Sequence, residues 1–136
     1  LAEGLDKVFT AQWANLNPEY IFHLAAIPRI LHSIEDPVKT MKNNVIAGSN
    51  VLNYARKIGA KRVIYSSSSS VVGNGNGPTN PYALQKYTTE LETKIYSEIY
   101  GLDTVSLRYF NVYSECQQID SPYVTVLANW MKIKTK

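Results

Sequence analysis

Three short apolar runs alternate with longer amphipathic segments along this chain, and this alternation limits the possible folds more than any other feature. The runs lie at residues 20–26, 63–65 and 104–110. The first is almost continuously apolar, which is typical of a strand buried on both faces of a parallel sheet. Strands that alternate with helices indicate an open α/β fold with right-handed crossovers, which binds ligands at the carboxyl ends of its strands.

The segments between the runs carry the signals that start and stop helices. Asp36-Pro37 and Asn80-Pro81 each place a side-chain acceptor before a proline, which predicts a helix start. Gly59 and Gly101 supply left-handed stops. Apolar spacing predicts two further helices, one over 5–16 and one from Ser121 through 131. The predicted order is therefore α-β-α-β-α-β-α.

The composition fits one globular domain covering residues 1–136. Hydrophobic residues make up 45% of the chain, while 14 Lys and Arg stand against 11 Asp and Glu. The basic residues are scattered, which does not favour nucleic-acid binding. One cysteine is too few for a disulfide framework, the two histidines have no third metal ligand in register, and no run of about 18 apolar residues is present. We expect a cytoplasmic protein with no metal and no membrane contact.

Tyr82 and Lys86 form the most informative pair of chemical groups. They lie four residues apart at the start of a predicted helix, and Ser68 ends the preceding strand. This spacing puts the phenol and the ammonium on one helical face, one turn apart. A nearby lysine charge favours the phenolate and suits Tyr82 to proton transfer. On spacing alone, the pair is better explained by an ordinary amphipathic helix, because Tyr and Lys are common there.

The strand, serine cluster, loop and helix start around this pair resemble the extended short-chain dehydrogenase/reductase superfamily. The sequence motifs resemble those of its NAD-dependent nucleotide-sugar epimerases and dehydratases. The resemblance covers about residues 18–126. The segments that carry it are Phe22-His23-Leu24-Ala25-Ala26, Ser33-Ile34-Glu35-Asp36-Pro37, Asn43-Asn44-Val45 with Gly48, Val63 through Val71, Pro81 through Lys86, and Leu107 through Val112. The resemblance implies a Rossmann-like parallel sheet with flanking helices.

The resemblance also implies roles for individual residues. The catalytic residues would be Ser68, the general base Tyr82 and its partner Lys86. The residues expected to bind NAD are Ala25, Ala26, Asn43, Tyr82, Lys86 and Phe110, and those expected to bind a UDP-linked sugar are Ser68, Tyr82 and Asn111. Packing or backbone contacts remain alternative roles for the two alanines, Asn43 and Phe110. Relatives commonly dimerise through the helices that here begin near Asp36 and Asn80.

The residues after Ser68 favour one reaction within this resemblance. Dehydratases of the family carry an acidic pair there, whereas this chain has Ser69-Ser70-Val71. The resemblance therefore implies a UDP-sugar 4-epimerase that works by transient oxidation at C4.

The main departure from the family is that no glycine-rich phosphate loop precedes Leu24. The Gly-rich first half of the fold is missing from this sequence, and residues 73–77 are predicted to form a turn. We expect a partial chain. The alternative is a truncated, noncatalytic member of the family that self-associates, and the coding region upstream of Leu1 would distinguish the two.

Overall fold

The computed structural model of the chain describes residues 17–114, 126 and 129–130, and within them a three-stranded sheet and its helices. The strands are β1 (Tyr20–His23), β2 (Arg62–Ser68) and β3 (Thr104–Tyr109). The helices are α2 (Ile30–Glu35), α3 (Pro37–Met41), the π-helical segment η1 (Lys42–Ile46), α4 (Ala47–Ile58), the 3-10 turn η2 (Ser69–Val72) and α5 (Pro81–Tyr100). No helix in this part of the chain is both long and apolar enough to cross a membrane.

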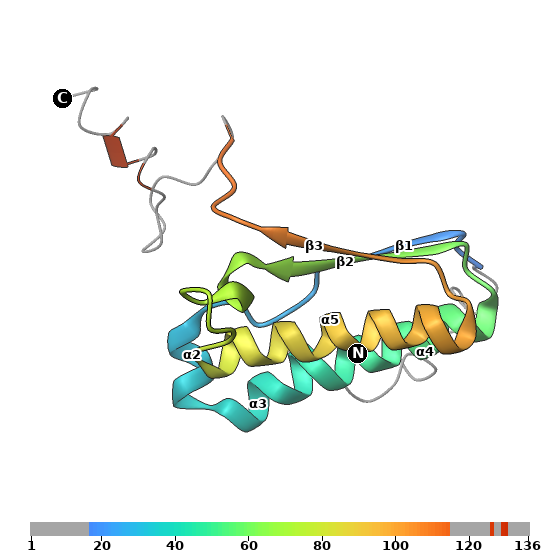
Figure 1. Cartoon of the computed structure of the whole chain (residues 1–136), viewed down its shortest axis with the longest axis horizontal. Coiled ribbons are helices and arrows are strands. Elements are labelled where there is room, and N and C mark those ends of the chain that lie inside the picture. The colour runs from blue at the N-terminus through green and yellow to red at the C-terminus, as the bar shows by residue number, and fades with distance from the viewer. Residues whose placement is uncertain (1–16, 115–125, 127–128, 131–136) are drawn as a thin grey trace.

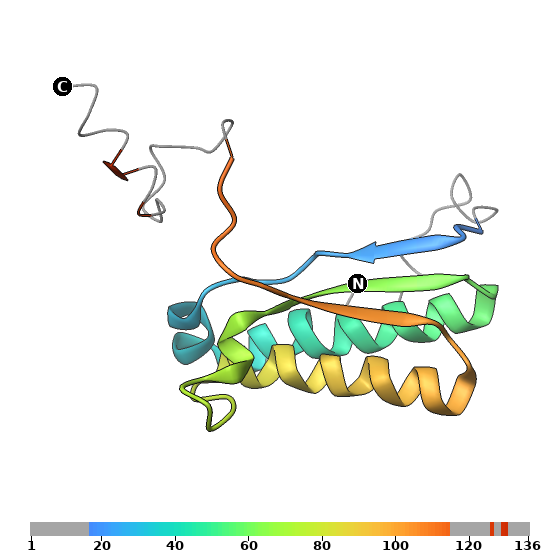
Figure 2. The ribbon, with the colours of Figure 1, turned by 45° about the horizontal axis from the view of Figure 1, so that its top comes forward.

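The sheet is parallel throughout, in the order β1-β2-β3, which confirms the predicted α/β class. Val63 of β2 pairs with Ile21 of β1 and with Thr104 of β3. Figure 1 and Figure 2 show α4 and α5 side by side beneath one face of the sheet. All three strands therefore end at the same edge of the sheet, where the serines of β2 lie.

Burial along the strands follows from this two-layer arrangement. The core under the sheet is built on Leu52, Ala55, Val63 and Leu102. In β1, His23 is buried, whereas Phe22 is 67% exposed. The prediction that the first strand is buried on both faces is therefore wrong for the described residues. Successive side chains of a strand point to opposite faces, and the helices that the structure describes lie against one face of this sheet.

The start and stop signals of the helices act as predicted. The Asp36 carboxylate accepts a hydrogen bond from the Lys39 N–H at 2.9 Å. The Asn80 amide oxygen accepts one from the Ala83 N–H, also at 2.9 Å. The cap Gly101 is left-handed, with φ of 67°. The structure adds α2, which the sequence did not predict. The predicted helix over 5–16 lies outside the described residues, and so does most of the helix predicted from Ser121.

Helices α3, η1 and α4 form one continuous helical path. The residues at both junctions, Met41 and Ala47, have right-handed helical backbone angles. The predicted single long helix from Asp36 is thus confirmed, with a π-helical segment inside it. Such segments change the phase of a helix, because each turn contains more residues, and they are frequent at functional sites.

Candidate active site

A cavity of about 330 Å³ opens at the carboxyl edge of the sheet. This is within the range of small-molecule sites. Its walls come from the ends of all three strands and the start of α5. The lining residues are Leu24, Ala26, Pro28, Ser66, Ser67, Ser68, Tyr82, Lys86, Tyr109 and Phe110. All three predicted catalytic side chains therefore line one cavity.

Ser68 and Tyr82 meet at the mouth of this cavity, where β2 ends and α5 begins. The backbone of Ser68 is extended. Its hydroxyl accepts a hydrogen bond from the Ser70 N–H at 3.2 Å and one from the Ser70 hydroxyl at 2.9 Å. Burial raises the pKa of Tyr82, while a hydrogen bond with Ser68 and the positive charge of Arg29 lower it. Arg29 is thus a positive charge near Tyr82 that the sequence analysis did not single out, and the role expected of Lys86 in favouring the phenolate stays a prediction.

Lys86 lies deeper in the cavity and is only 4% exposed. Its Nζ donates a hydrogen bond to the backbone carbonyl of Ser66 at 2.8 Å and lies 5.1 Å from the centre of the Tyr65 ring. Burial lowers the pKa of Lys86 to about 8. Burial, and to a smaller extent the charge of Lys86, lower the pKa of His23 to about 4. At neutral pH, Lys86 thus carries a positive charge beside a neutral imidazole.

Asn44 fixes the loop that follows β1 against the catalytic helix. Its amide oxygen accepts the Ile27 N–H at 2.7 Å, and its Nδ2 donates to the Ile27 carbonyl at 3.1 Å and to Gln85 Oε1 at 2.8 Å. Gln85 Nε2 donates in turn to Thr40 at 2.9 Å. Asn44 is 2% exposed. This buried network positions the turn of α5 that carries Tyr82 and Lys86, and our sequence analysis did not single it out.

The start of α5 is held by a further contact from α2. The Tyr82 N–H donates to Ser33 Oγ at 2.9 Å, and that hydroxyl donates to the Ile30 carbonyl at 2.6 Å. Ser33 is fully buried. The backbone of the predicted base is therefore anchored separately from its phenol, so the phenol can engage a ligand without loosening the helix.

The other predicted binding residues lie in different surroundings. Ala26 and Phe110 line the cavity, whereas Ala25, Asn43 and Asn111 are not among the lining residues. Asn43 is exposed and its amide donates to the Lys39 carbonyl at 2.8 Å. Contact of these five residues with cofactor or substrate stays a prediction.

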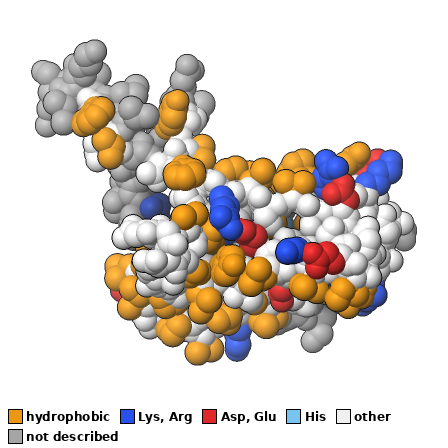
Figure 3. All heavy atoms as spheres, in the orientation of Figure 1, with side chains coloured by type: hydrophobic (Ala, Val, Ile, Leu, Met, Phe, Trp, Pro, Cys, Tyr) orange, Lys and Arg blue, Asp and Glu red, His pale blue; other side chains and the backbone are white. Residues whose placement is uncertain are grey.

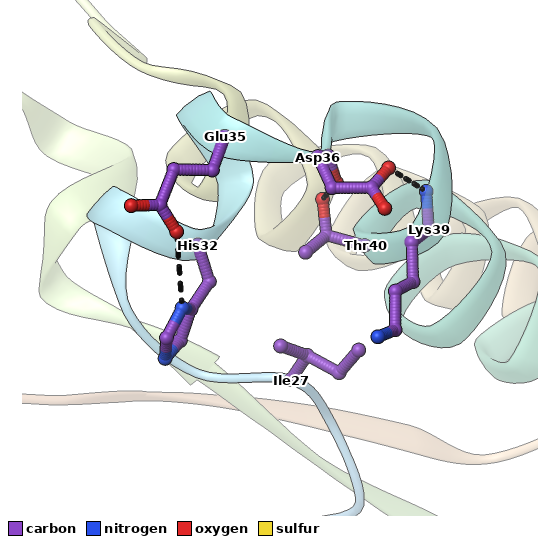
Figure 4. Close-up of a pocket in the computed structure, with 6 residues that line it drawn as sticks. All are labelled: Ile27, His32, Glu35, Asp36, Lys39 and Thr40. Atoms are coloured by element: carbon purple, nitrogen blue, oxygen red, sulfur yellow. Dashed lines mark hydrogen bonds and ion pairs between the residues drawn. The ribbon is translucent and has the colours of Figure 1, made fainter.

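A second hollow, of about 280 Å³, lies between α2, α3 and the loop after β1 (Figure 4). Its walls are Ile27, His32, Glu35, Asp36, Lys39 and Thr40. The polar groups there already serve the local helices: the Asp36 carboxylate caps α3, and His32 Nδ1 lies 3.6 Å from Glu35. Within the described residues, no group of three or more His, Cys, Asp or Glu could hold a metal ion.

Comparison with known proteins identifies the family. Residues 5–134 match the NAD dependent epimerase/dehydratase family. The chain belongs to this family. It is 32% identical over 127 residues to a UDP-glucose 4-epimerase from Mycolicibacterium smegmatis, an alignment that covers 85% of this chain and 41% of that protein.

Solved structures of the family share the fold. A UDP-N-acetylglucosamine 4-epimerase from Methanobrevibacter ruminantium, in complex with UDP-N-acetylmuramic acid, has a TM-score of 0.78 and 38% identity, covering 86% of this chain and 41% of that one. A UDP-glucose 4-epimerase from Thermus thermophilus in complex with NAD has a TM-score of 0.72 and 27% identity, covering 98% and 44%. The chain thus spans less than half the length of these family members.

The cofactor of this family is NAD, and the cavity has the chemistry to hold part of it. A ribose needs hydrogen-bonding groups next to its neighbouring hydroxyls, and Tyr82 and Lys86, which line the cavity, carry a phenol and an ammonium. The residues present therefore fit the nicotinamide-ribose end of the cofactor.

Proposed function

We propose that these residues are the catalytic half of an NAD-dependent UDP-sugar 4-epimerase. The observation that carries the proposal is the convergence of Ser68, Tyr82 and Lys86 on one cavity at the carboxyl edge of a parallel sheet. None of the described lining residues is a carboxylate. Elimination of water, as in a dehydratase, needs further acid and base groups, so the lining favours epimerisation.

Tyr82 is the proton-transfer group of the proposed reaction. When bound, NAD supplies a hydride acceptor and donor for C4 of the sugar. The Tyr82 phenolate accepts the proton of the 4-hydroxyl and returns it to the same oxygen after the configuration at C4 has been inverted. Burial raises the pKa of this phenol, so the positive charge of Arg29 and the Ser68 hydroxyl are needed to favour the phenolate.

Ser68 and Lys86 position the reacting groups. The Ser68 hydroxyl lies beside the phenol and can hydrogen-bond the 4-oxygen while its charge changes. The Lys86 ammonium, held by the Ser66 carbonyl, can donate to ribose hydroxyls one helical turn deeper. Both groups are fixed by the fold before a ligand binds, which is what effective positioning requires.

The test is epimerase activity of the complete polypeptide, expressed from its full open reading frame. UDP-glucose, UDP-N-acetylglucosamine and UDP-glucuronate are the substrates to assay. Tyr82→Phe should abolish epimerisation, because the proton-transfer group is lost, and should weaken NAD binding by no more than about 5- to 10-fold, the equivalent of one hydrogen bond. Tyr87→Phe on the same helix should retain full activity. Turnover by Tyr82→Phe would refute the proposed base, and no turnover by the parent would favour the noncatalytic alternative.

Self-association through the long helices is a further part of the proposal. The outer surfaces of α5, α3 and η1 carry exposed apolar side chains, visible over α5 in Figure 3: Leu84, Leu91, Ile95, Ile99, Val38, Met41 and Ile46. We infer a homodimer through these surfaces, in the cytoplasm. Light scattering should give twice the chain mass for the parent, while Leu91→Glu should give a monomer and Lys94→Glu a dimer. A monomeric parent would contradict this.

A further inference from the structure

Lys86 carries a buried ammonium for which the described part of the chain provides no carboxylate partner. The residue is 4% exposed, and none of the ion pairs between described residues includes it. Glu90, one helical turn further along α5, is bound instead by Ser67 and Arg108. A charge that is taken out of water without compensation is costly, so other groups must support this ammonium.

The side chain of Tyr65 touches Lys86 at two places. β2 lies over α5 (Figure 1), and Tyr65 reaches from the strand to the helix. Lys86 Nζ lies over the Tyr65 ring, 5.1 Å from its centre. At this distance the negative face of an aromatic ring attracts a cation. The Tyr65 hydroxyl donates to the Lys86 backbone carbonyl at 3.4 Å. One side chain therefore contacts both the ammonium and the helical turn that carries it.

Tyr65 is itself held in place and uncharged. It is 2% exposed, and its ring lies 5.7 Å from that of His23, its partner in the β1–β2 pairing. Burial raises the pKa of Tyr65 well above its usual range, so the phenol stays neutral. Burial lowers the pKa of His23 to about 4, so the imidazole is neutral at pH 7. The ammonium thus lies beside a buried pair of neutral rings.

We propose that Tyr65 is a positioning residue for Lys86, and that its ring face supports the ammonium together with the Ser66 carbonyl. An ammonium has three protons to donate, and the carbonyl takes one of them. A carboxylate in place of the ring would neutralise the charge and compete for the remaining protons. An aromatic face stabilises the charge while leaving those protons for ligand hydroxyls. The inference rests on the proposed function for the ribose as that ligand.

The test follows the titration of Lys86 by NMR of its Cε in the complete polypeptide without ligand, the signal being the one absent from Lys86→Met. Tyr65→Leu removes the ring but keeps apolar bulk, so the midpoint of this titration should fall by about 0.5–1 pH. Tyr65→Phe keeps the ring face and should titrate like the parent. Val63→Ala is the matched control, because Val63 is buried on the same strand but packs in the core with Leu52 and Leu102. It should lower the urea midpoint and leave the Lys86 titration unchanged.

A second readout is the pH dependence of NAD affinity, measured by calorimetry. The other titratable groups around the ammonium are His23 on β1, Tyr82 on α5 and Tyr109 on β3. In Tyr65→Leu the affinity should decline at a lower pH than in the parent. Tyr65→Met serves in its place if the leucine variant does not fold.

The outcomes separate this inference from the proposed function. An unchanged Lys86 titration in Tyr65→Leu, or an equal fall in Tyr65→Phe or Val63→Ala, would overturn the inference. A lower titration midpoint in Tyr65→Leu, with NAD affinity that keeps the pH dependence of the parent, would refute the proposed role of Lys86 towards the cofactor. That result would leave the positioning by Tyr65 standing.

Discussion

Replacing Asn44 by alanine should destabilise the fold far more than replacing its neighbour Asn43. The Asn44 side chain makes three buried hydrogen bonds, to the Ile27 N–H, to the Ile27 carbonyl and to Gln85. The Asn43 side chain makes one exposed bond, to the Lys39 carbonyl. Both residues lie in the same π-helical segment, so the pair is internally matched for helix propensity.

The magnitude follows from the groups that each substitution leaves without a partner. A buried hydrogen bond contributes about 1 kcal/mol, so Asn44→Ala should lower the free energy of unfolding by about 3 kcal/mol. Asn43→Ala should change it by less than about 0.5 kcal/mol, as for other exposed sites. With a urea m-value of about 1–3 kcal/mol/M, the midpoint of Asn44→Ala should fall by about 1–3 M.

The assay is equilibrium urea denaturation of the complete polypeptide followed by tryptophan fluorescence and circular dichroism. Coincident transitions by the two probes are needed before the midpoints are compared. The NAD affinity of Asn44→Ala should also fall, because the loop that Asn44 holds carries Ala26 and Pro28 into the cavity. Equal midpoints for the two variants would refute the positioning role of Asn44.

Three further predictions follow from burial and close packing. Burial lowers the pKa of His23 to about 4 in the folded chain, below its usual 6.5. The free energy of unfolding should therefore fall by about 3 kcal/mol as the pH drops from 6.5 towards 4. In urea titrations His23→Gln should make this pH dependence weaker, and an unchanged dependence would contradict the prediction. Gly48→Ala should lower the melting temperature, since its Cβ would lie 2.6 Å from Thr89 Cγ2 and cost about 1–3 kcal/mol; a higher melting temperature would show that the α4–α5 contact is loose. Arg29→Gln should raise the pKa of Tyr82 and move the rising limb of the pH profile of kcat/KM to higher pH, whereas the control Lys39→Gln should not. The same profile for Arg29→Gln and the parent would show that Arg29 does not influence Tyr82.

The sequence was sufficient to predict the elements that local chemistry determines. Asp36 and Asn80 cap helices as their side chains suggested, and Gly101 ends α5 in a left-handed conformation. The convergence of Ser68 and Tyr82 on one cavity follows because, in a parallel α/β sheet, the strands end and the following helices begin at one edge. These features depend on a few neighbouring residues, so one sequence reveals them.

Features that depend on phase and on tertiary contact could not be predicted in this way. Which asparagine of the pair 43–44 faces the β1 loop depends on a rotation of about 100°, and the π-helical segment changes that phase. The exposure of Phe22 depends on helices covering a single face of the described sheet. The charge that Arg29 brings to Tyr82 comes from a loop residue with φ of 90°, an unusual angle that no local pattern indicates.

The central claim is that C4 of the sugar is oxidised and reduced again within one site. The most direct test is epimerisation of a UDP-sugar that carries deuterium at C4, in ordinary water, with the complete polypeptide. The account predicts that the product keeps the deuterium at C4, since the hydride removed from C4 is returned to it while Tyr82 exchanges only the hydroxyl proton. Loss of deuterium to the solvent would contradict it, because C4 would then have been inverted by proton exchange.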